Sequence, residues 1–105
     1  IHVVDLAKAH AAAIGYAGAH YGCEAINVGA GQGSSVLEVV RAFEAASGQS
    51  IPYEVVARRS GDIAAFYADP AKAKSLLGWQ TERSLADMCK SAWNWQRKNP
   101  QGYKG

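Results

Sequence analysis

The spacing of apolar residues predicts four helices in this chain. We expect the first helix to begin after Asp5, as N-cap, and to end near Gly18. The second follows Ser35, because a Glu three residues after a Ser is a capping-box signature, and it ends at Gly48. The apolar positions that define the faces of these two helices are Leu6, Ala9, Ala13, Ala17, Val36, Val39, Val40 and Phe43.

A third, short helix is predicted between Asp69 and Gly78. Asp69 is the expected N-cap, Pro70 is favoured at the first helical position, and a glycine commonly follows a helix C-terminus. We expect Trp79, directly after this helix, to fold back onto the core.

The fourth helix is expected to begin at Ser84, with Asp87 in its first turn, and to end at Asn99 and Pro100. Cys89 lies on its apolar stripe, so we expect this thiol to be buried and inert. The stripe consists of Leu85, Met88, Cys89, Ala92, Trp93 and Gln96.

Two short strands are predicted between the helices, at residues 24–29 and 51–56. The first is expected to be a short buried strand that leads into a glycine-rich loop, and the second alternates and is rich in β-branched residues. The expected fold class is therefore α/β, with helices packed on a few short strands, and residues 1–105 are expected to form a single domain.

The composition excludes several classes of function. The chain has 105 residues, 49% of them hydrophobic, and a formal charge of +2, which does not indicate a nucleic-acid partner. No apolar run approaches the roughly 20 residues of a membrane span, so no membrane partner is expected. The two cysteines and three histidines lack metal-site spacing, and the low cysteine content suits a reducing cytoplasm.

The glycine loop at residues 29–33 lies between a predicted strand and a predicted helix, where a dinucleotide fingerprint is found. The loop departs from that fingerprint, because the third glycine would fall at Ser34 and no acidic residue ends the next strand. The alternative is a tight turn whose backbone passes close to another group, either a ligand or the protein itself.

A second candidate lies directly after the second predicted strand, where Arg58 and Arg59 are followed by Asp62. Arginine binds phosphate oxygens with two parallel hydrogen bonds, and a carboxylate accepts from sugar hydroxyls, so the group suits a ribose phosphate. A surface ion pair between Asp62 and either arginine is the equal alternative.

Four quoted segments together resemble one family. They are IHVVDLAKAH, INVGAGQGSSVLEVVRAFEAASGQ, RRSGDIAAFYADPAKAKSLLGW and WNWQRKNPQGY. Over essentially the whole chain, they resemble the C-terminal part of the UDP-glucose 4-epimerase family. The members of that family are extended short-chain dehydrogenases/reductases. The resemblance implies that this chain is the smaller, substrate-binding portion, and that a Rossmann domain holding NAD precedes it in a longer protein.

The resemblance also implies roles for individual residues. Arg59 and Asp62 would bind the phosphate and ribose of UDP, and Val36 would lie beside the nucleotide. Phe66 would limit the size of the sugar, favouring UDP-glucose and UDP-galactose over their N-acetylated counterparts. These residues define the expected substrate site, and no residue of this chain is expected to bind the cofactor.

In this family NAD takes the hydride from C4 of the sugar and returns it to the other face, while a tyrosine of a Tyr-x-x-x-Lys pair moves the proton. No tyrosine of this chain has a lysine four residues later within it, so the isolated chain is not expected to be catalytic. A cytoplasmic homodimer is implied for the full-length enzyme. The alternatives are another nucleotide-sugar epimerase, dehydratase or decarboxylase, and a nucleotide-binding module without catalysis.

Overall fold

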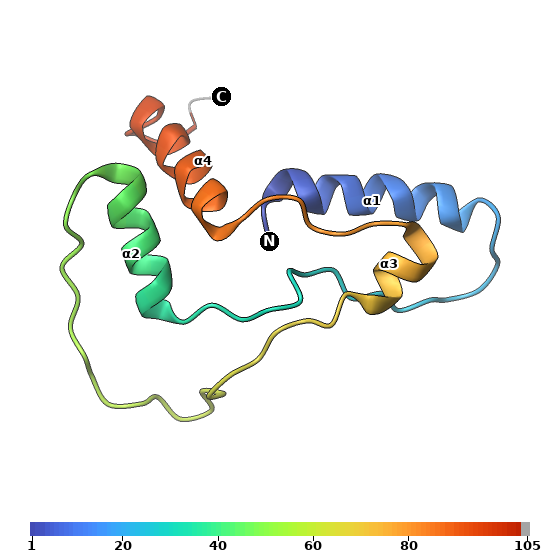
Figure 1. The fold of residues 1–105 in the computed structure, drawn as a ribbon, viewed down its shortest axis with the longest axis horizontal. Helices are drawn as coiled ribbons and strands as arrows, with labels where there is room; N and C mark the ends of the chain where they lie inside the picture. The colour runs from blue at the N-terminus through green and yellow to red at the C-terminus, as the bar shows by residue number, and fades with distance from the viewer. Residues whose placement is uncertain (104–105) are drawn as a thin grey trace. The chain divides into compact units, whose positions relative to one another are not determined.

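The structure is a computed structural model that describes residues 1–103. The chain forms two compact units, each built from two separate stretches of sequence. Unit 1 comprises residues 1–33 and 65–83, and unit 2 comprises residues 34–64 and the described residues from 84 onward. The four predicted helices are present, two in each unit (Figure 1). The single substrate-binding domain expected from the sequence stays a prediction.

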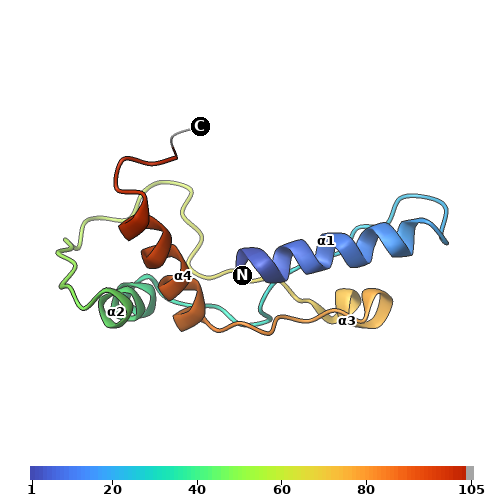
Figure 2. The ribbon, with the colours of Figure 1, turned by 90° about the horizontal axis from the view of Figure 1, so that it is seen from above.

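Unit 1 contains helix α1, Val3–Ala17, and helix α3, Ala71–Leu77, which lie side by side (Figure 2). Its core is small and consists of Ala9 on α1, Ala73 on α3 and Trp79 just beyond α3. Trp79 therefore folds back onto the core, as predicted. Three further apolar residues pack against this core, namely Ile26, Val28 and Leu77.

Two helix starts in unit 1 differ from prediction. The N-cap of α1 is His2, whose Nδ1 accepts a hydrogen bond from the backbone N–H of Val4 at 3.1 Å. Asp5 was expected there, but it lies inside the first turn, because its carboxylate is bound by a different part of the chain. α3 begins one residue late, after Pro70, although the Asp69 carboxylate accepts from the Ala71 N–H at 2.9 Å.

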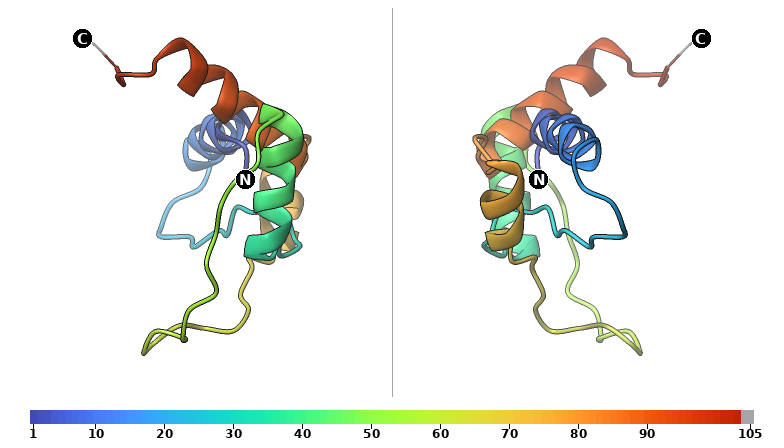
Figure 3. Two further views of the ribbon diagram at one scale, coloured as in Figure 1. Left: turned by 90° about the vertical axis from the view of Figure 1, so that its left-hand side faces the viewer. Right: turned by 90° about the vertical axis from the view of Figure 1, so that its right-hand side faces the viewer.

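Unit 2 contains helix α2, Val36–Ser47, and helix α4, Leu85–Lys98, which pack against each other (Figure 3). Both begin with a capping box. The box of Ser35 with Glu38 was predicted, and α4 has a second one, formed by Ser84 with Asp87. α2 ends at Gly48, whose left-handed φ of 70° explains the glycine there.

The two predicted strands are wrong as regular elements. Residues 24–29 and 51–56 have no strand structure, and the residues that the structure describes contain no strand at all. No backbone–backbone hydrogen bond involves residues 24–29 or 52–56 within the described chain. An alternating pattern predicts which side chains share a face, but a strand also needs a neighbouring strand to receive its backbone hydrogen bonds. The described residues supply no such neighbour, so the α/β class is not observed.

Candidate nucleotide-sugar site

A tight turn in unit 2 positions two of the predicted site residues. The backbone N–H of Asp62 donates to the carbonyl of Arg59 at 3.3 Å, which closes a four-residue turn. Gly61 occupies its third position with a φ of 85°, a left-handed value that a side chain would strain. The glycine therefore allows Arg59 and Asp62 to lie at the two ends of one turn.

The side chains of Arg59 and Asp62 form a two-point ion pair. Nε of Arg59 donates to Oδ2 of Asp62 at 3.3 Å, and its second terminal nitrogen lies 3.3 Å from Oδ1. The arginine side chain is 85% exposed and the aspartate 39% exposed. Such an exposed pair contributes at most about 1 kcal/mol, so a ligand can displace it at little cost. The observed pair is compatible with both sequence-based interpretations, a surface ion pair and a ligand-binding group.

The other two predicted site residues are exposed apolar side chains. Val36 is the first residue of α2 and is 79% exposed, and Phe66 is 84% exposed. Val36 belongs to unit 2 together with the turn, whereas Phe66 belongs to unit 1. Of the four predicted residues, Arg59 and Asp62 are the two that a direct contact joins.

The glycine loop packs against its own chain. A Cβ at Gly29 would lie 2.8 Å from the Cβ of Ala68, closer than side chains approach one another. Gly31 has a φ of 73°, and a Cβ there would lie 3.3 Å from Pro70. Glycines at these two positions are therefore explained by the close passage of residues 68–70. With that space filled by protein, the loop does not fit a dinucleotide.

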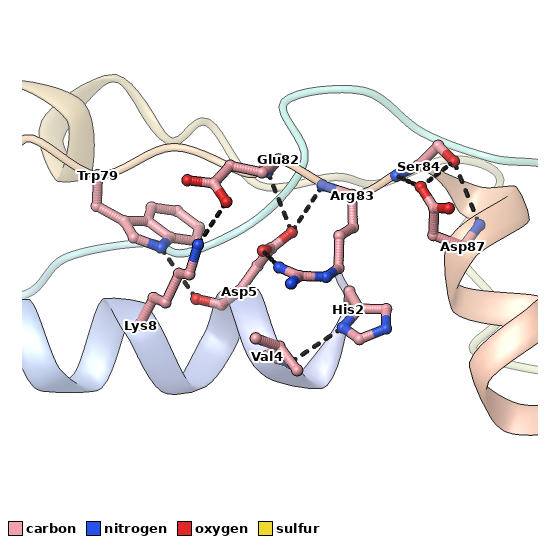
Figure 4. A network of polar contacts seen from close by, with 9 residues as sticks. All are labelled: His2, Val4, Asp5, Lys8, Trp79, Glu82, Arg83, Ser84 and Asp87. Atoms are coloured by element: carbon pink, nitrogen blue, oxygen red, sulfur yellow. Dashed lines mark hydrogen bonds and ion pairs between the residues drawn. The ribbon is translucent and has the colours of Figure 1, made fainter. Parts of the chain in front are cut away.

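A buried network around Asp5 was not predicted from the sequence (Figure 4). Asp5 is fully buried, and its Oδ2 accepts from the backbone N–H groups of Glu82 at 3.1 Å and Arg83 at 2.9 Å. Its Oδ1 accepts from the Arg83 guanidinium at 2.6 Å, and Nε1 of Trp79 donates to its backbone carbonyl at 2.9 Å. Lys8 pairs with Glu82 beside this network. The network attaches α1 to residues 79–83 and is structural.

The hydrogen bonds to Asp5 set its protonation. Burial by itself raises the pKa of this carboxyl, but the bonds from the Arg83 backbone and guanidinium and from the Glu82 backbone outweigh it. The pKa of Asp5 therefore lies below its ordinary value of 3.8. Burial also raises the pKa of the Cys89 thiol, which agrees with the predicted inert cysteine.

A groove of about 550 Å³ lies between α2 and α4 within unit 2. Its walls are mainly apolar and include Phe43, Ile51, Pro52, Trp93 and Trp95. None of the residues that line it is charged, so it lacks the cation that a phosphate group needs. The groove is therefore a poor candidate for the nucleotide, despite its size.

Two further classes of site are not found among the residues that the structure describes. No group of three or more histidine, cysteine, aspartate or glutamate residues is arranged to hold a metal ion in residues 1–103. Nor is any helix in this range long and apolar enough to cross a membrane.

The comparisons with known proteins identify a close relationship. No protein-family model matches the chain. The UDP-glucose 4-epimerase of Neisseria meningitidis serogroup C is 54% identical over 103 residues, which is 98% of this chain and 30% of that protein. The human UDP-glucose 4-epimerase is 52% identical over the same share of each chain.

Solved structures agree with the sequence comparison. The UDP-glucose 4-epimerase of Bifidobacterium longum, in complex with NAD⁺ and UDP, matches with a TM-score of 0.84 and 52% identity over 98% of this chain and 30% of that one. The enzyme of Stenotrophomonas maltophila, with bound NAD and formylated UDP-arabinopyranose, matches with a TM-score of 0.91 and 42% identity over 96% and 30%. This chain thus spans about a third of the relatives it matches, and the resemblance found in the sequence is confirmed. In both sequence and fold, the chain corresponds to the C-terminal part of the UDP-glucose 4-epimerases.

Proposed function

We propose that this chain is the substrate-binding C-terminal part of an NAD-dependent UDP-glucose 4-epimerase, which interconverts UDP-glucose and UDP-galactose. The observation that carries the proposal is the 52–54% identity to such enzymes over nearly the whole chain. The chain contributes substrate contacts, while the tyrosine–lysine pair and the NAD site belong to the preceding part of the enzyme. NAD, when bound there, would accept the hydride from the sugar and return it.

The Arg59–Asp62 turn is the proposed UDP-binding element. Arg59 would release its exposed partner and donate two parallel hydrogen bonds to phosphate oxygens, each worth roughly 1.5–3 kcal/mol. The exchange is favourable, since the ion pair that it breaks contributes no more than about 1 kcal/mol. Asp62 would then accept a hydrogen bond from a ribose hydroxyl, and Val36 would pack beside the nucleotide.

The test uses a joined enzyme, in which this chain replaces the C-terminal part of the Bifidobacterium longum epimerase. Arg59→Ala should weaken UDP binding by about 2 kcal/mol, or about thirtyfold, in a calorimetric titration. Arg58→Ala is the matched control, since it removes the same charge one residue away, and it should change affinity less than threefold. Equal affinity for the Arg59 variant and the unchanged joined enzyme would return the turn to the surface-ion-pair interpretation.

Phe66 is the proposed limit on sugar size. A ring at this position fills space that an N-acetyl group would need, so Phe66→Gly in the joined enzyme should add turnover of UDP-N-acetylhexosamines. If the variant keeps its activity on UDP-galactose and gains none on the N-acetylated sugar, Phe66 does not act as this gate.

The remaining proposals concern the complete enzyme and rest on the resemblance alone. We expect it to be a cytoplasmic homodimer, and sedimentation of the joined enzyme at the mass of two chains would support the dimer. UDP binding by this chain alone, without turnover by the joined enzyme, would instead favour a nucleotide-binding module.

A further inference from the structure

Helix α1 has an unusual surface for the outside of a protein. Of its 15 residues, the only acidic or basic ones apart from His10 are Asp5, which is buried, and Lys8, which pairs with Glu82. α4, of similar length, carries four such residues, and all of them are exposed. A helix with so few charged side chains facing water is normally covered on more than one side.

Unit 1 covers only one side of α1. Asp5 and Ala9 are buried against the rest of the unit. The opposite side, which we call the outer face, consists of Val3, Ala7, Ala11 and Ile14, and all four residues are exposed. Val3 is 71% exposed and Ile14 76% exposed. Their spacing of four, four and three residues places them in one stripe along the helix.

We propose that the outer face of α1 is the surface on which the preceding part of the epimerase chain docks. The inference rests on the proposed function and names the partner of unit 1. The match covers 30% of each of these relatives, so most of each relative's chain lies outside the match and can supply such a partner. The alanines at positions 7 and 11 let another backbone approach closely, while Val3 and Ile14 supply apolar area at the two ends of the stripe.

The edges of the outer face fit a partner that is itself apolar. Lys8 borders it on one side, but its charge is engaged by Glu82. His10 borders it on the other side, where its Nδ1 is hydrogen-bonded to the Leu6 carbonyl at 2.9 Å. Between these two residues the face offers no charge to an acidic or basic surface, which disfavours nucleic acid and anionic lipid as occupants.

The test measures maleimide labelling of single cysteines in a Cys23→Ser background, since Cys23 is exposed and Cys89 is buried. In the chain alone, Ile14→Cys and the control Tyr21→Cys should react at similar rates, because both positions are exposed. In the joined enzyme, labelling at position 14 should slow at least tenfold, whereas labelling at position 21 should change less than twofold. Equal rates at position 14 in the two proteins would overturn the proposal.

A second variant covers the case in which the cysteine disturbs folding. Ile14→Lys should leave the melting temperature of the chain alone within about 1 °C, but lower that of the joined enzyme by several degrees, because a lysine would be forced into an apolar contact. No difference between the two proteins would also overturn the docking. The proposed function has a separate test. If Arg59→Ala leaves UDP binding unchanged while position 14 is protected from labelling, the proposed function fails but the docking does not.

Discussion

The close approach of Gly29 to Ala68 gives the sharpest prediction for the stability of unit 1. A Cβ added at position 29 would lie 2.8 Å from the Cβ of Ala68, whereas two carbon atoms prefer about 3.5–4.0 Å. Relieving that overlap by shifting the backbone costs about 1–3 kcal/mol. Gly29 has no left-handed φ, so an alanine also gains about 0.4–1 kcal/mol by restricting the unfolded chain. Gly29→Ala should therefore destabilise unit 1 by about 1–2 kcal/mol.

Gly15→Ala makes the same chemical change inside α1 and serves as the control. No atom lies within 4 Å of a Cβ at Gly15, and alanine is favoured over glycine in a helix by about 1 kcal/mol. The two variants should therefore shift the thermal midpoint of this chain in opposite directions, followed by circular dichroism at 222 nm. At about 4–8 °C per kcal/mol, the two midpoints should differ by roughly 10 °C or more.

A double variant tests the cause of the effect. Ala68→Gly removes the atom that the new Cβ would meet. Gly29→Ala should therefore cost much less stability when it is added to the Ala68→Gly variant than when it is added to the unchanged chain. Additive effects of the two changes, or a Gly29→Ala variant as stable as the unchanged chain, would refute the packing explanation of the glycine loop.

Three further predictions concern the polar groups. The pKa of Asp5 lies below its ordinary 3.8, so its hydrogen bonds stabilise the fold fully above that pH. This stabilisation is lost as the pH falls through the lower pKa of the folded state. Asp5→Asn should therefore flatten the acid limb of a curve of stability against pH. Arg83→Met should lower the free energy of unfolding in urea, and more than Lys8→Met, whose ion pair is exposed. Ser84→Ala should cost about 1 kcal/mol through lost capping, while Ser84→Asp, which keeps an acceptor, should cost less.

Local signals in the sequence predicted the helices well. Each capping box satisfies backbone N–H groups within four residues, so the start of α2 at Ser35 follows from local chemistry alone. The turn from Arg59 to Asp62 is equally local, because Gly61 supplies the left-handed position. The predicted strands failed for the opposite reason, because a strand needs a neighbouring strand for its backbone hydrogen bonds and the residues that the structure describes supply none.

Asp5 illustrates why the rest of the candidate chemistry was not predictable. An aspartate before an apolar helix is an ordinary N-cap signal, and His2 is a less common cap that residue type alone does not favour. What decides the role of Asp5 is a guanidinium and two backbone N–H groups from residues 77 and 78 positions further along the chain. No periodicity links residues so distant in the sequence.

The same long-range contact explains how unit 1 is held together with only a small apolar core. Only Ala9, Ala73 and Trp79 form its buried apolar cluster, and two of these are alanines. The Asp5 carboxylate and carbonyl together accept four hydrogen bonds from residues 79–83, all shielded from water at the acceptor. Hydrogen bonds to a buried charge contribute more than neutral ones, and removing a partner leaves that charge unsatisfied. In unit 1 the hydrogen bonds to Asp5 therefore supply part of the stability that a larger apolar core supplies in other proteins. They leave the outer face of α1 free for a partner.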